Sequence, residues 1–267
     1  MRNLFRLFST VAIAAMGFTA SAQDWAKGRL EKSPRHLEWA DVKHGDRTVK
    51  CYIAYPEVKD KAPVVIVIHE IFGLSDWVRG VTDQLAEAGY IAIAPDLLSG
   101  MAPGGGGTDK LGGAEGVRNA ISSLPADQIT ADLDAVADYA LKLPAANGKL
   151  AVAGFCWGGG QSFRYATHQK QLKSAFVFYG PSPESDQLKN ISCPVYGFYA
   201  GNDSRINAGL PATTKAMKAA GKPYEPETYD GAGHGFMRAG EAPDASADNK
   251  KARDKAWERW KGLLKNL

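Results

Sequence analysis

The sequence predicts an α/β fold with a mostly parallel central sheet and helices on both of its faces. Short apolar runs alternate along the chain with longer amphipathic segments, which is the order expected when helices join parallel strands. The runs are almost continuously apolar, so both faces of each strand are expected to be covered. A chain of 267 residues has room for one large domain of this kind.

The expected elements follow from these runs and from the turn residues between them. The strands are residues 62–69, 90–95, 149–155, 174–180, 194–201 and 224–230, and the helices are residues 76–88, 127–142, 158–169, 207–220 and 246–265. Gly89 and Gly221 end two of the helices. Before them, apolar and polar residues alternate on both sides of His44-Gly45-Asp46, which predicts an antiparallel opening hairpin.

The N-terminus has the pattern of a secretory signal peptide. Arg2 and Arg6 precede an apolar stretch, and Ala20-Ser21-Ala22 offers a small-residue cleavage site. A membrane anchor is the alternative, but the apolar run is too short to span a bilayer. We therefore expect a signal peptide over residues 1–22, cleavage after Ala22, a single domain over residues 23–267, and a periplasmic or secreted protein with no membrane attachment.

Charge and motif content point to a small-molecule partner. The formal net charge is +3, and basic and acidic residues are spread along the chain, so neither a nucleic-acid tract nor a membrane-binding patch is expected. No H-E-x-x-H or similar spacing occurs, so no metal and no cofactor are expected. The glycine-rich segment 96–113 lacks the Gly-Lys-Ser/Thr ending of a phosphate-binding loop, and we expect a mobile segment near the site.

The stretch "GFCWGGG" (154–160) places Cys156 between an expected strand and an expected helix. Gly154-x-Cys156-x-Gly158 is the G-x-S-x-G nucleophile elbow with cysteine in place of serine, and small flanking residues permit its sharp turn. A helix N-terminus also favours a thiolate. Cys156 is the candidate nucleophile, and a buried structural cysteine is the alternative.

A base and an acid follow the nucleophile in α/β-hydrolase order. Asp203 in "AGNDSR" and His234 in "DGAGHGF" both lie just after expected strands, at the edge where open α/β sheets keep their sites. An ordinary turn residue is the alternative for Asp203. The remaining histidines are poorer candidates, because they flank the hairpin, end a helix or precede a loop: His36, His44, His69 and His168.

The segment "HEIFGLSDW" (69–77) follows the first central strand, where this fold supplies an oxyanion-binding N–H. We assign the oxyanion hole to the backbone N–H groups of Ile71 and Trp157. Glu70 is a carboxylate at the strand tip and a further candidate for the catalytic site. The alternative interpretation is that Glu70 is a solvent-exposed or helix-capping acid.

Taken together, "HEIFG", "APDL", "GFCWGGG", "GND" and "AGHGF" resemble the dienelactone hydrolase family, α/β-hydrolases with a cysteine nucleophile. The resemblance implies the α/β-hydrolase fold, with Cys156 as nucleophile, His234 as base and Asp203 as acid. It also implies that Glu70 contacts the resting thiol and that Arg238 helps to bind a substrate carboxylate. The family carries a second such arginine after "PDL", where this chain has Leu98, Ser99 and Gly100, so dienelactone itself is in question as the substrate.

These observations predict an exported hydrolase of carboxylic esters or lactones that works through a thioester. A hydrolase of thioesters or phosphotriesters and a non-catalytic small-molecule-binding protein are the alternatives. A redox role is disfavoured, because neither Cys51 nor Cys193 forms a C-x-x-C pair with Cys156. We expect these two cysteines to be structural and unpaired.

Overall fold

The computed structural model describes residues 24–267, and the expected signal peptide lies outside the described residues. Eight strands form one sheet in the order β1-β2-β4-β3-β5-β6-β7-β8. The strands are β1 (Leu37–His44), β2 (Arg47–Ala54), β3 (Ala62–Ile68), β4 (Ile91–Pro95), β5 (Ala146–Phe155), β6 (Leu172–Phe178), β7 (Val195–Asn202) and β8 (Tyr224–Gly233). The pairs β1·β2 and β2·β4 are antiparallel and the others parallel, which confirms the predicted sheet and its opening hairpin.

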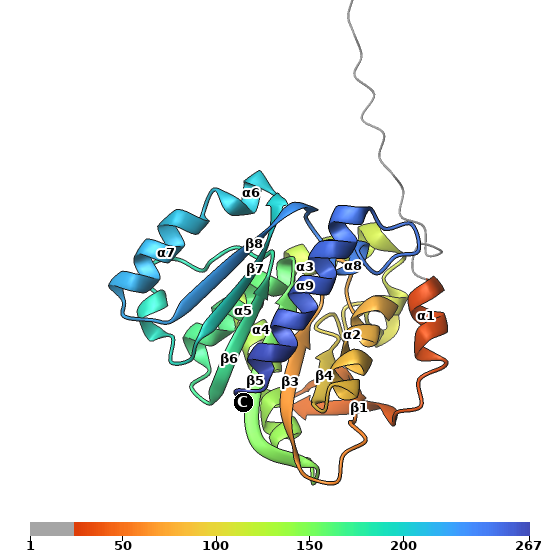
Figure 1. Cartoon of the computed structure of the whole chain (residues 1–267). Helices are drawn as coiled ribbons and strands as arrows, with labels where there is room; N and C mark the ends of the chain where they lie inside the picture. Colours follow the sequence, from red (N-terminus) through yellow and green to blue (C-terminus); the bar gives the residue numbers. More distant parts are fainter. Residues whose placement is uncertain (1–23) are drawn as a thin grey trace, which may run out of the picture.

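Helices cover both faces of the sheet, as predicted (Figure 1). The α-helices are α1 (Asp24–Leu30), α2 (Asp76–Glu87), α3 (Ala114–Ser123), α4 (Ala126–Leu141), α5 (Trp157–His168), α6 (Ser204–Asn207), α7 (Leu210–Ala219), α8 (Phe236–Ala239) and α9 (Ala247–Leu264). Within the described part of the chain, no helix combines the length and the apolar character needed to cross a membrane.

The sheet separates two apolar cores. Alternate residues of β3 point to opposite sides, so Ile66 packs with α4 and α5 residues, whereas Val65 and Val67 pack with residues of α2 and α9. Burial of strands on both faces explains why their sequences are continuously apolar.

Two predictions about the helices need correction. The chain from 207 to 220 is not one helix, because α6 ends at Asn207 and α7 begins at Leu210, where Pro211 suits the first turn of a new helix. The helices α1, α3 and α8 were not predicted from the sequence.

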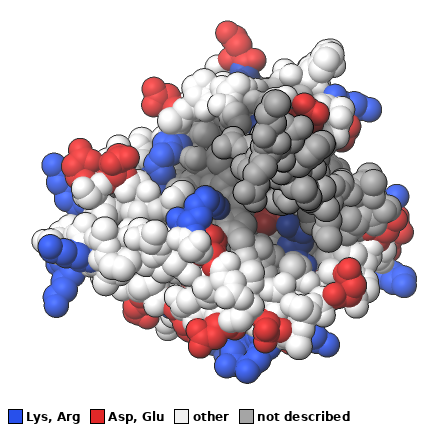
Figure 2. Space-filling view, turned by 90° about the horizontal axis from the view of Figure 1, so that it is seen from above, with Lys and Arg blue, Asp and Glu red and all other residues white. Residues whose placement is uncertain are grey.

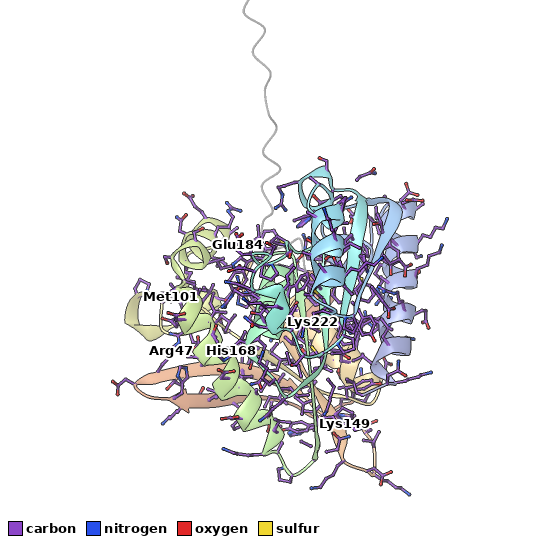
Figure 3. The ribbon with its side chains drawn as sticks, turned by 90° about the vertical axis from the view of Figure 1, so that its left-hand side faces the viewer. Arg47, Met101, Lys149, His168, Glu184 and Lys222 are labelled. Carbon is purple, nitrogen blue, oxygen red and sulfur yellow. The ribbon has the colours of Figure 1, made fainter. Side chains whose placement is uncertain are left out.

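The glycine-rich segment 96–113 contains two short 3₁₀ turns and is anchored at its ends. Asp96 accepts hydrogen bonds from the backbone N–H and the hydroxyl of Thr108, at 2.8 and 2.7 Å. Arg47, in the hairpin (Figure 3), donates to the carbonyl oxygens of Leu97 and Ser99. The segment is thereby tied both to itself and to the opening hairpin.

Candidate active site

The candidate residues meet at the carboxyl edge of the sheet, as predicted. Cys156 follows β5, Asp203 follows β7, and His234 follows β8. Figure 3 shows this edge on the side of Glu184, with Lys149 towards the opposite end of the sheet. Parallel strands therefore bring together side chains that are far apart in the sequence.

The turn that carries Cys156 is strained, and glycines permit it. Cys156 has φ 58° and ψ −116°, a region that non-glycine residues rarely occupy. A Cβ on Gly154 would lie 1.9 Å from the carbonyl oxygen of Gly158, and one on Gly158 would lie 2.4 Å from the backbone oxygen of His69. Glycine at these positions lets α5 start close against the ends of β3 and β5, which is the geometry of a nucleophile elbow.

The three side chains form a continuous hydrogen-bonded chain. Nδ1 of His234 lies 2.5 Å from Oδ2 of Asp203, and Nε2 lies 3.1 Å from Sγ of Cys156. Asp203 is buried, and an ionised carboxylate only accepts hydrogen bonds. Nδ1 therefore carries the proton, and Nε2 is left as the acceptor that faces the thiol.

Two backbone N–H groups point at the sulfur. The N–H groups of Trp157 and Ile71 hydrogen-bond Sγ of Cys156, and both lower the pKa of the thiol. They come from different segments, one from the start of α5 and the other from the turn after β3. The two N–H groups assigned to the oxyanion hole therefore both lie beside the sulfur of Cys156.

The N–H of Trp157 at the start of α5 lowers the pKa of the Cys156 thiol, which is the direction that the sequence predicts, but this effect is outweighed in the resting site. Burial and the negative charge of Glu70 raise the pKa of Cys156 to about 11, against the smaller lowering by the two N–H groups. At neutral pH the resting thiol is protonated. Attack by the sulfur therefore needs a base, and His234 is in contact with it.

Glu70 and Arg238 form a buried ion pair beside the thiol. Glu70 is 2% exposed, and its Oε2 accepts a hydrogen bond from Nε of Arg238 at 2.7 Å. The family resemblance implies a contact between Glu70 and the resting thiol. The negative charge of Glu70 raises the pKa of that thiol, while Oε2 of Glu70 is hydrogen-bonded to Arg238. Arg238 also lies over the ring of Phe72, with 5.0 Å from Cζ to the ring centroid. A buried charge of this kind requires a partner, which explains the pairing.

A cleft of about 1170 Å³ borders the ion pair. It is bounded by the hairpin, the 72–79 turn and the glycine-rich segment, and it reaches the site at Phe72 and Arg238. Figure 2 shows a hollow on this face with basic and acidic side chains around it. At the hairpin end, Trp39 is 47% exposed, with Lys50 Nζ 4.9 Å and Arg79 Cζ 5.7 Å from its ring. These cleft residues were not predicted from the sequence, and the available signal was a large aromatic residue, Trp39, in the expected hairpin.

The other two cysteines are buried and free, as predicted. Burial raises the pKa of Cys193 to about 11 and that of Cys51 still further. Among residues 24–267 there is no group of three His, Cys, Asp or Glu side chains placed to hold a metal ion.

Comparison with known proteins places the chain in a family. A model of the dienelactone hydrolase family matches residues 49–267. A protein of Yersinia pestis, assigned as a carboxymethylenebutenolidase, is 36% identical over 197 residues, which are 69% of this chain and 73% of that protein. A protein of Saccharolobus solfataricus with the same assignment is 31% identical over 255 residues, covering 82% of this chain and 94% of that protein.

Solved structures agree with this placement. A crystal structure assigned as a dienelactone hydrolase, from Klebsiella pneumoniae, has a TM-score of 0.76 and 28% identity, with 87% of this chain and 99% of that chain covered. A dienelactone hydrolase-like promiscuous phosphotriesterase from metagenomic libraries has a TM-score of 0.73 at 19% identity, covering 87% and 98%, and shares the fold. The chain belongs to the dienelactone hydrolase family, within the α/β-hydrolase superfamily.

Proposed function

We propose that this protein hydrolyses carboxylic esters or lactones through a thioester on Cys156. The observation that carries the proposal is the chain of contacts from Asp203 through His234 to Sγ, at 2.5 and 3.1 Å. A nucleophile in contact with a base, and a base oriented by a third group, form the arrangement that acyl transfer needs.

In the first step, Nε2 of His234 takes the thiol proton while Sγ attacks the substrate carbonyl. The N–H groups of Ile71 and Trp157 bind the resulting oxyanion. The intermediate collapses to a thioester when the carbon–oxygen bond to the alcohol breaks, and His234 returns its proton to that oxygen. With a lactone, the same cleavage opens the ring and the hydroxyl stays on the acyl group.

In the second step, His234 takes a proton from water, and the hydroxide oxygen attacks the thioester carbonyl. The same N–H groups bind the second oxyanion. Collapse breaks the carbon–sulfur bond, returns the proton to Sγ and releases the acid. The net reaction consumes one water and yields one acid and one alcohol group.

Glu70 and Arg238 act as a pair beside this centre. Burial and the negative charge of Glu70 keep the resting thiol protonated, so the sulfur attacks only as His234 accepts its proton. We propose that Arg238 contributes to binding a substrate carboxylate, in competition with its hydrogen bond to Glu70.

The test is hydrolysis of p-nitrophenyl acetate and of a small lactone by the residue 23–267 protein and by its Cys156→Ala variant. Cys193→Ala is the matched control, because it removes a buried free thiol outside the site. Turnover lost in Cys156→Ala and kept in Cys193→Ala supports the proposal. Equal turnover by the parent and Cys156→Ala would refute it. Faster turnover of a thioester or a phosphotriester than of the ester and the lactone would show that the substrate belongs to that other class.

We also propose that the protein is exported. The support is the basic, apolar and small-residue pattern of residues 1–22. Expression of the full chain in a host with an outer membrane, followed by fractionation and N-terminal sequencing, tests this. A periplasmic protein that starts at Gln23 is the expected result, and a cytosolic protein that keeps residues 1–22 would contradict it.

A further inference from the structure

His69 lies behind both donors of the oxyanion hole without facing the substrate. It is fully buried, and it belongs neither to the Cys156, His234 and Asp203 chain nor to the residues that line the cleft. Its Nδ1 lies 2.8 Å from the backbone oxygen of Glu70, and its ring is stacked on that of Trp157 with centroids 5.3 Å apart and planes at 17°.

The proton on His69 can be placed from these contacts. A carbonyl oxygen only accepts hydrogen bonds, so Nδ1 carries the proton and donates it. Nε2 is then bare, and among the described residues it has no hydrogen-bond partner. Burial lowers the pKa of His69, so the ring remains neutral in this tautomer.

The hydrogen bond from His69 fixes the direction of an oxyanion donor. The carbonyl of Glu70 and the N–H of Ile71 belong to one peptide unit, and no peptide bond in the described chain is cis. In a trans peptide these two groups point in opposite directions across one plane. By holding the Glu70 oxygen, together with the N–H of Gly73 at 3.1 Å, His69 aims the Ile71 N–H towards Sγ.

The second donor is held from the same side chain. Trp157 supplies its backbone N–H to the site, and its indole ring rests on the His69 ring. The hydrogen bond to Glu70 also polarises the shared peptide unit, which strengthens the Ile71 N–H as a donor.

We infer that His69 is a positioning residue of the oxyanion hole, which orients the Ile71 N–H through the Glu70 carbonyl and supports Trp157 by stacking. This inference rests on the proposed hydrolase function. Because both acyl transfers pass through an oxyanion, His69 acts on kcat, while substrate binding in the ground state depends on it little.

The test compares two substitutions of nearly the same shape, His69→Asn and His69→Leu. The Asn amide nitrogen can take the place of Nδ1 and donate to the Glu70 oxygen, whereas Leu offers no donor. His69→Leu is expected to lower kcat for p-nitrophenyl acetate by about 10-fold to 100-fold, somewhat less than loss of a whole oxyanion donor. KM is expected to stay within about threefold, and His69→Asn is expected to recover most of the loss.

His69→Phe is the second donor-free variant, and it retains an aromatic ring to stack on Trp157. Thermal unfolding and circular dichroism identify variants that fold. Equal kcat in the parent and in a folded Leu or Phe variant would overturn the inference while leaving the proposed function intact. Equal losses in folded Asn and Leu variants would also overturn the hydrogen-bonding role, and a parent that hydrolyses no ester would overturn both proposals.

Discussion

Replacing Asp203 with asparagine exchanges one carboxylate oxygen for an NH₂ group and tests whether Asp203 fixes the tautomer of His234. In the structure, the Asp203 carboxylate accepts the Nδ1 proton at 2.5 Å. An Asn side chain can present its NH₂ group instead, which forces Nδ1 to accept and moves the proton to Nε2. Nε2 would then face the thiol with a proton and could not take another.

The expected loss in kcat is about 10⁴-fold, the size associated with the wrong histidine tautomer in a comparable triad. KM is expected to change little, because Asp203 is buried and absent from the cleft lining. The assay is steady-state hydrolysis of p-nitrophenyl acetate over a pH series. Asp230→Asn is the matched control, since Asp230 is an exposed aspartate of the same strand β8 that carries His234 at its end. A loss below tenfold in folded Asp203→Asn protein would refute the reasoning.

Four further predictions follow from the same geometry. Gly158→Ala is expected to lower stability by about 1–3 kcal/mol in urea unfolding because its Cβ would meet backbone oxygens, whereas Gly262→Ala, in open space within α9, should raise it by about 0.5–1 kcal/mol. A thiol reagent should modify one cysteine in the folded protein, Cys156, and all three cysteines after unfolding. Fewer than three modified cysteines in the unfolded protein would contradict this. Glu70→Gln should lower the pKa of the Cys156 thiol from about 11. Alkylation of this thiol at pH 8 should then be faster, about tenfold for each unit by which the pKa falls. Slower alkylation would show that Glu70 does not raise the pKa of the thiol. Trp39→Ala should raise KM about threefold to tenfold for esters with a large aromatic group and leave KM for p-nitrophenyl acetate unchanged; equal effects on both would rule out the cleft as the binding surface.

The sheet could be predicted closely because its residues face apolar surroundings on both sides. The run that becomes β3 has every residue but one buried, so its composition alone indicates a central strand. The hairpin was equally clear, because the turn at Gly45 has positive φ and separates two alternating segments. Helix α3 was missed because only three of its ten residues are buried and a glycine-rich segment precedes it.

The meeting of the candidate site residues at one edge of the sheet could be predicted, but their electrostatics could not. A strand, a helix and small residues around Cys156 are local features, and they indicate an elbow. The pKa of Cys156 depends instead on burial and on the charge of Glu70. Glu70 lies 86 positions before Cys156 in the sequence. The pairing of Glu70 with Arg238 spans 168 positions, and only the folded sheet brings the two together.

The central claim is that Cys156 carries the acyl group, and rapid-quench mass spectrometry tests it most directly. The residue 23–267 protein is mixed with p-nitrophenyl acetate, quenched in acid within milliseconds, and digested for peptide mapping. One acetyl group on the peptide that contains Cys156, formed with the first release of nitrophenolate and lost again as the substrate is exhausted, is the predicted result. Turnover with no acetyl group on Cys156, or with the group on another residue, would contradict the account.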